Sequence, residues 1–116
     1  MNSKENTITI PEKAKANLEL DVKALQQFCV KYHIVELSLF GSILRDDFSD
    51  KSDVDMIVRF DQDFSVTLFD MVGIEEELST IIGRPVDLVT RYSVETSENY
   101  IRRKHVLETE EKIYAA

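Results

Sequence analysis

Residues 39–58, LFGSILRDDFSDKSDVDMIV, lead into an apolar run that opens with two carboxylates. The part from 53 to 60, DVDMIVRF, has the composition of a β-strand, in which successive side chains point to opposite faces of a sheet. One face then carries Val54, Met56 and Val58, and the other carries Asp53, Asp55 and Ile57. The first face suits a buried core. The acidic pair on the second face requires a separate explanation.

The sequence on both sides of this strand predicts a small layered domain. Period-two alternation predicts strands at 34–40, IVELSLF, and at 85–90, PVDLVT. Helical spacing of apolar residues predicts helices at about 18–32 and 66–82. A polar helix at about 95–105 and a short segment, EKIYA, are expected after them. Gly83 and Pro85 end the second helix. The expected fold is α/β (α+β), with a small mixed sheet of three to five strands and helices mainly on one face.

Side-chain alternation also predicts where a third carboxylate lies. If Val86 and Leu88 face the same helices as the apolar residues of 53–60, then Asp87 emerges on the opposite face, together with Asp53 and Asp55. Two carboxylates about 5 Å apart repel each other by about 3 kcal/mol at an effective dielectric constant of about 20. Water can screen this repulsion, or a divalent cation can reverse it. Mg²⁺ suits such an incomplete cage, which water and substrate phosphates would complete.

Composition narrows the classes of function. A chain of 116 residues is the size of one domain. Its 22 acidic and 14 basic residues give a net charge of −8, which disfavours stable binding to nucleic acid. The sequence shows neither a membrane span nor a secretory signal. The single cysteine, Cys29, lies on the apolar stripe of the first predicted helix, where a core role is expected. Together these features predict a cytoplasmic protein.

The spacing of the polar residues carries a family resemblance. Gly41-Ser42, ten further residues, Asp53-x-Asp55 and a later Asp87 resemble the signature of the polymerase-β-like nucleotidyltransferase superfamily. LFGSILRDDF, SDVD, GRPVDLV and the closing KIYA resemble the minimal nucleotidyltransferase (MNT) group, many members of which are antitoxins to HEPN-domain ribonuclease toxins. The resemblance implies one nucleotidyltransferase domain at 18–116. Residues 1–17 then form an N-terminal extension, which could be a disordered lead, an edge strand or a contact for a partner.

The resemblance also implies roles for individual residues. Asp53 and Asp55 would hold Mg²⁺ on ATP, and Asp87 would be a third metal ligand that helps deprotonate the acceptor hydroxyl. Gly41 and Ser42 would secure the phosphates. For three basic residues the partners stay open. Arg45 could contact a phosphate or form an ion pair with Asp46, Asp47 or Asp50. Arg103 or Lys104 could contact the triphosphate.

The implied activity is transfer of AMP from ATP to a hydroxyl, expected to be a tyrosine, of a HEPN toxin, with which the chain would form a hetero-oligomer. Two alternatives stay open. One is a nucleotidyltransferase that modifies a small molecule or an RNA end, and the other is an antitoxin that neutralises its partner by binding alone. Retention of Gly41, Ser42 and the three aspartates argues against binding alone, because binding does not require clustered acids.

Overall fold

The computed structural model describes residues 8–15, 18, 20–46, 48–49 and 51–116. The described residues form a sheet in the order β3-β2-β1-β4. Its strands are β1 (Ile34–Phe40), β2 (Val54–Phe60), β3 (Val86–Thr90) and β4 (Glu111–Ala115). β1 is antiparallel to both β2 and β4, whereas β2 and β3 are parallel. The predicted mixed sheet is therefore confirmed, and EKIYA is one of its edge strands.

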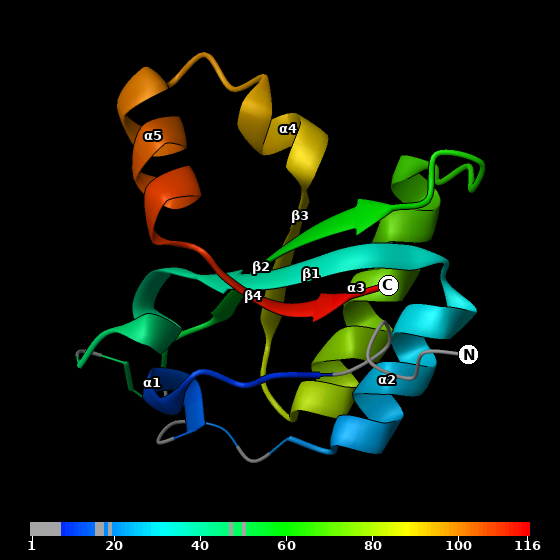
Figure 1. The fold of residues 1–116 in the computed structure, drawn as a ribbon, viewed down its shortest axis with the longest axis horizontal. Coiled ribbons are helices and arrows are strands. Elements are labelled where there is room, and N and C mark those ends of the chain that lie inside the picture. Colours follow the sequence, from blue (N-terminus) through cyan, green and yellow to red (C-terminus); the bar gives the residue numbers. More distant parts are fainter. Residues whose placement is uncertain (1–7, 16–17, 19, 47, 50) are drawn as a thin grey trace.

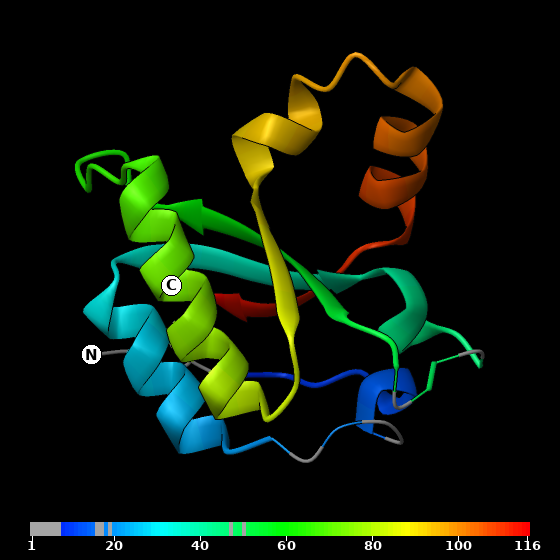
Figure 2. The same cartoon turned by 180° about the vertical axis from the view of Figure 1, so that it is seen from behind.

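The helices lie on two sides of this sheet. α2 (Val22–Lys31) and α3 (Leu68–Ile82) run side by side against one face, and the short α1 (Glu12–Lys15) lies near the opposite end of the sheet (Figures 1 and 2). The other face is spanned by an arch, which we define as residues 91–110. It contains α4 (Arg91–Glu95) and α5 (Tyr100–Thr109) and connects β3 to β4.

The main core lies between the sheet and helices α2 and α3. Alternate residues of the strands point into it, and those of β2 and β3 are the predicted set: Val54, Met56, Val58, Val86 and Leu88. From the helices, Leu25 and Phe28 of α2 and Leu78 of α3 pack against them. Cys29 is also fully buried there, as expected for a core residue. Each such side chain contributes about 1.5–3 kcal/mol by leaving water.

Side-chain caps set the ends of the helices. Asp21 accepts a hydrogen bond from the Ala24 amide (3.0 Å), so α2 begins at Val22, later than the expected residue 18. Thr67 and Asp70 form a reciprocal capping box that starts α3. Gly83, with φ of 79°, ends α3 as predicted.

The polar helix predicted at about 95–105 has different bounds in the structure, because Thr90 and Asn99 each start a separate helix. The Thr90 side chain caps α4, and the Asn99 side chain accepts a hydrogen bond from the Arg102 amide (3.0 Å) to start α5. The segment between them leaves helical conformation after Thr96. The last helix consequently runs to Thr109, four residues beyond the expected end.

The described part of the N-terminal extension packs on the sheet. Ile8 bridges to Tyr114, the Thr9 amide donates to the Ile113 carbonyl (2.8 Å), and Ala14 is fully buried in the core. Residues 1–7 and 16–17 lie outside the described residues. The division at residue 17 stays a prediction. Within the described ranges, none of the helices has the length and apolar character that a bilayer crossing needs.

Candidate functional site

The alternation of β2 and β3 brings two of the predicted acids together. Asp55 is the second residue of β2, Asp87 is the second residue of β3, and the two are register partners in the parallel pair. Neighbouring strands are about 4.8 Å apart. Both side chains project from the face opposite the main core, since their neighbours Val54, Met56, Val86 and Leu88 are buried in it. Asp53 lies two residues before Asp55, just ahead of β2, and is exposed like Asp87.

The electrostatics of Asp55 reflect this crowding. Burial raises the pKa of the Asp55 carboxyl, and the negative charges of Asp87 and Asp53 raise the pKa further. The positive charges of Arg102 and Arg45 oppose these effects without cancelling them. The free protein therefore holds like charges close together at this edge of the sheet, and a bound cation would relieve the repulsion.

Gly41 contacts the same carboxylate from the other neighbouring strand. Phe40, the last residue of β1, is the register partner of Asp55, and Gly41 follows it with φ of +78°. A Cβ atom at residue 41 would collide with Oδ2 of Asp55. Glycine is thus required both for its backbone conformation and for this close approach. Ser42 comes next, partly buried, in the 3-10 helix η2 (Gly41–Leu44).

The arch brings cations to the same face of the sheet. A cavity of about 70 Å³ lies beneath it, and its lining includes Phe40 and Val89 of the sheet and Arg102, Arg103 and Val106 of α5. Phe40 is the register partner of Asp55, and Val89 lies two residues beyond Asp87 on the same side of β3. The cavity therefore adjoins the acids. Val106, Phe40 and Ile57 form a small second core that seats α5 there.

The sequence shows Arg102 only as a member of a basic cluster with Arg103, Lys104 and His105, which can be a solvated helix face or a contact for phosphates or an acidic partner, and does not distinguish it as a site residue. It is exposed, and its charge acts on Asp55. Arg103, which was singled out, donates to the Ser97 carbonyl (2.6 Å) and lies 5.3 Å from the centre of the Tyr100 ring. In any α-helix residues 102, 103 and 106 share one face, and the packing of Val106 against Phe40 and Ile57 turns this face toward the sheet. Lys104 does not line the cavity.

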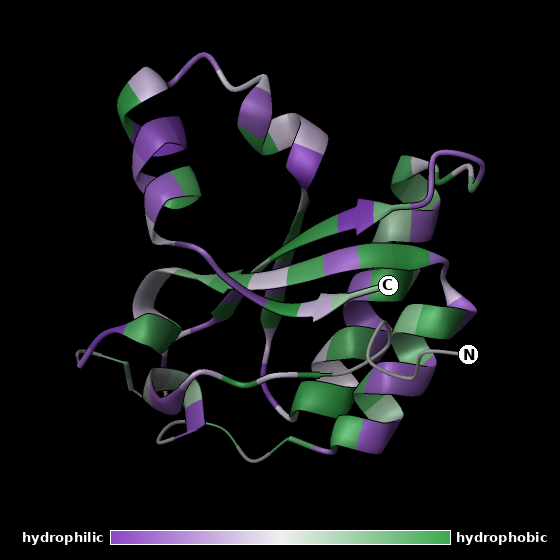
Figure 3. Cartoon of the chain, viewed as in Figure 1, coloured by the Kyte–Doolittle hydropathy of each residue, from purple (hydrophilic) through white to green (hydrophobic). Residues whose placement is uncertain are grey.

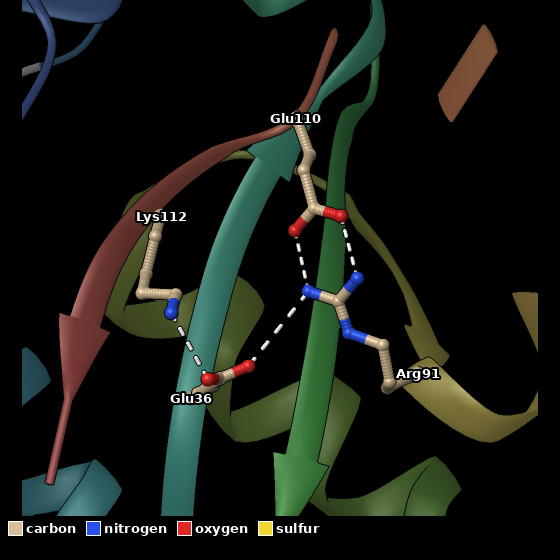
Figure 4. Close-up of polar contacts among 4 residues, drawn as sticks. All are labelled: Glu36, Arg91, Glu110 and Lys112. Atoms are coloured by element: carbon tan, nitrogen blue, oxygen red, sulfur yellow. Dashed lines mark hydrogen bonds and ion pairs between the residues drawn. The ribbon is translucent and has the colours of Figure 1, made fainter. Parts of the chain in front are cut away.

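A network of ion pairs closes the base of the arch. Arg91, at the start of α4, makes two hydrogen bonds to the carboxylate of Glu110, which follows α5 (Figure 4). The two side chains are only 15% and 14% exposed. Glu36 of β1 lies 3.8 Å from Arg91 and accepts a hydrogen bond from Lys112 (3.0 Å). This network fixes both ends of the arch to the sheet, and so fixes the segment that carries Arg102.

The contacts of Arg45 and the complete set of metal ligands stay predictions. Arg45 is exposed and ends η2, and of its three expected partners Asp47 and Asp50 lie outside the described residues. Among the residues that the structure describes, no group of three or more His, Cys, Asp or Glu side chains is arranged to hold a metal ion. Mg²⁺ commonly binds through one or two carboxylates together with substrate phosphates, so a complete protein cage is not required.

Comparison with known proteins adds independent information. A model of the nucleotidyltransferase domain family matches residues 22–111. Protein adenylyltransferase MntA of Thermococcus cleftensis is 33% identical over 66 residues, which are 57% of this chain and 65% of that protein. A Methanocaldococcus jannaschii protein, provisionally named a protein adenylyltransferase, is 34% identical over 64 residues, which are 55% of this chain and 64% of the Methanocaldococcus protein. The matches therefore span less than two thirds of the length of these two relatives.

Solved structures share the fold. A chain of a toxin-antitoxin crystal structure with AMP-PNP superposes with a TM-score of 0.63 at 15% identity, covering 84% of this chain and 75% of that one. A protein provisionally described as a minimal nucleotidyltransferase superposes with a TM-score of 0.58 at 26% identity, covering 77% of this chain and 85% of that one. The first likeness concerns the fold alone. The second agrees with the family match.

Proposed function

Because the chain belongs to the nucleotidyltransferase domain family, we propose that it is a Mg²⁺-dependent protein adenylyltransferase that transfers AMP from ATP to a hydroxyl group of a partner protein. The observation that carries the proposal is the pairing of Asp55 with Asp87 on the face of the sheet that the arch spans. Asp53 lies two residues from this pair, and the backbone at Gly41 lies against Asp55. The relatives named protein adenylyltransferase support the choice of acceptor class.

The acids suit a divalent cation on chemical grounds. Carboxylate oxygens are the ligands that Mg²⁺ prefers, and the pKa of Asp55 is raised by burial and by the negative charges of Asp87 and Asp53. Asp53 and Asp55 would hold the cation, with Asp87 as a third ligand. When bound, Mg²⁺ supplies positive charge that stabilises the attacking and leaving oxygens of a displacement at phosphorus.

The residues of the chain would then position the reaction. Gly41 and Ser42 hold the phosphates of ATP, and Arg102 and Arg45, whose positive charges act on Asp55, offset the charge of the triphosphate. The acceptor oxygen forms a bond to the α-phosphorus, while the bond from that phosphorus to the bridging oxygen breaks. Pyrophosphate leaves with the electron pair of that bond. The hydroxyl proton passes to a carboxylate oxygen of Asp87, which is exposed and accessible to an acceptor.

For the acceptor we propose a tyrosine of a HEPN-type ribonuclease toxin. The support is the similarity of the fold to a chain of a toxin-antitoxin structure with AMP-PNP. The chain would act as antitoxin within a hetero-oligomer. A cytoplasmic location follows from the proposal, because that compartment supplies ATP.

The test uses ATP labelled at either the α or the γ phosphate. The full chain is incubated with Mg²⁺ and the protein encoded by the neighbouring gene. Transfer of the α label to that protein, on a tyrosine identified by mass spectrometry, is expected. Transfer of the γ label would mean a kinase and would overturn the proposal. Label on an RNA end or a small molecule, with none on the protein, would favour a different acceptor.

A further inference from the structure

Arg84 joins the two segments that lead into the acid-bearing strands. It lies between Gly83, the cap of α3, and Pro85, which precedes β3. Its Nη2 donates to the carbonyl oxygen of Ser49 (2.6 Å) and to that of Ser52 (3.0 Å). Ser52 is the residue immediately before Asp53. A single side chain thus connects the start of β3 to the loop that delivers Asp53.

Arg84 is held by ring stacking as well as by hydrogen bonds. The Arg84 guanidinium lies 4.5 Å from the centre of the Phe48 ring, so it is stacked as well as hydrogen-bonded. Both acceptors are backbone carbonyls, which fixes the path of the main chain. Ser52 also accepts from the Ser49 amide (3.1 Å), which makes a turn within the loop, and Arg84 attaches that turn to the rest of the molecule.

The neighbouring contacts show what this attachment aligns. The Val54 amide donates to the carbonyl of Pro85 (2.9 Å), the residue that follows Arg84. In the strand pairing, Val54 is opposite Val86, and the next pair is Asp55 and Asp87. Asp55 is held within the sheet by its register. Asp53 precedes β2 and has no such support from a strand partner in the described pairing. Its direction therefore depends on the loop that Arg84 holds.

We propose that Arg84 is a positioning residue for Asp53. By orienting Asp53, Arg84 raises the affinity of the site for a divalent cation, although Arg84 itself does not contact the cation. The inference rests on the proposed function, because it assumes that Asp53 is a metal ligand. Partners that orient metal ligands commonly change metal affinity by about 10–100-fold when they are removed. Arginine suits this position better than lysine because its planar group stacks on Phe48 while it donates to two oxygens.

The test measures Mn²⁺, a spectroscopic substitute for Mg²⁺, by electron paramagnetic resonance with AMP-PNP and the full chain. Arg84→Met keeps the apolar stem but removes both hydrogen bonds, and it should weaken Mn²⁺ binding by about 10-fold or more. Arg84→Lys should fall between Arg84→Met and wild type. Lys51→Ala is the matched control, because it removes an exposed positive charge from the same loop, and it should bind Mn²⁺ as wild type does.

The outcomes separate the two proposals. If Arg84→Met binds Mn²⁺ with wild-type affinity, the positioning role is overturned. This holds even if the variant melts at a lower temperature, because Arg84 would then only stabilise the fold. An equal loss in Lys51→Ala would overturn it too, since net charge alone would explain the effect. Failure of wild type itself to bind Mn²⁺ with AMP-PNP would count against the proposed function. If Arg84→Met does not fold, the comparison of Arg84→Lys with Lys51→Ala decides.

Discussion

The two faces of the sheet are made by the same strands but differ in chemistry. On the face toward α2 and α3, the cross-strand row at the centre is Leu39, Met56 and Leu88, and each of these side chains is buried. On the opposite face, the next row is Phe40, Asp55 and Asp87. The apolar row gains free energy simply by leaving water. The acidic row loses free energy through repulsion and burial, as the raised pKa of Asp55 indicates.

The arch accounts for part of this difference. The apolar face is covered by two helices, α2 and α3, that pack several apolar side chains on the sheet, whereas α5 is largely hydrophilic and packs on the sheet through few apolar side chains (Figure 3). The structure of the polar face therefore depends on ion pairs, such as that of Arg91 with Glu110, and on close backbone contacts, such as that of Gly41 with Asp55. Stability resides mainly on one face of the sheet and the proposed chemistry on the other, so substitutions on the two faces should have separable effects.

The largest effect is expected from Asp53→Asn combined with Asp55→Asn. Transfer of the α label should fall by more than about 100-fold, because loss of even a supporting partner of a metal ligand costs about 10–100-fold. The unfolding temperature without Mg²⁺ should be unchanged or higher, since repulsion is removed. Asp63→Asn, three residues beyond the end of β2, is the control and should leave transfer intact. A double variant that still transfers AMP would exclude these ligands.

On the apolar face, Leu78→Ala should lower the free energy of unfolding by about 2–5 kcal/mol, because Leu78 is fully buried against the sheet. Leu68→Ala makes the same change on the same helix at a side chain that is 88% exposed, and it should change stability by less than about 0.5 kcal/mol. Denaturant titration measures both. Equal effects would mean that α3 does not pack as described.

Gly41 follows β1 and lies against Asp55, and Gly83 gives a matched comparison. Both have positive φ, but an added Cβ meets Asp55 at residue 41 and nothing within 4 Å at residue 83. Gly83→Ala should cost about 1 kcal/mol from backbone strain alone and should not affect transfer. Gly41→Ala should cost about 1–3 kcal/mol and also reduce transfer, because it displaces the Asp55 carboxylate. Normal transfer by Gly41→Ala would contradict the contact.

The sequence predicts some of these features better than others, for physical reasons. Strand alternation is a local property, so the separation of Met56 from Asp55 could be read from DVDMIVRF. The bounds of the helices in the arch were mispredicted because caps at Thr90 and Asn99, and not apolar spacing, set them. The hydrogen bonds from Arg84 to the loop at Ser49 and Ser52 join residues more than 30 positions apart, and no local pattern encodes such a pairing.

The smallest effect, on the polar face, concerns Glu36 in the network below the arch. Burial raises the pKa of this carboxyl, but the hydrogen bond from Lys112 and the charges of Lys112, Arg59 and Arg91 outweigh burial, so the pKa is lowered overall. A carboxyl with a lowered pKa in the folded state stabilises the fold above its unfolded pKa, and this contribution is lost as the pH falls through the folded pKa.

Glu36→Gln should therefore reduce the free energy of unfolding at pH 7 by at most about 1 kcal/mol, the usual limit for partly exposed pairs. The difference from wild type should shrink as the pH falls below about 4, and it should also shrink in high salt, which screens the pairs. Glu98→Gln, in the exposed connection between α4 and α5, is the control and should show neither trend. A difference for Glu36→Gln that is equal at pH 7 and pH 3 would mean that Glu36 stabilises the sheet by packing, and the polar face would then be less dependent on charge than its composition indicates.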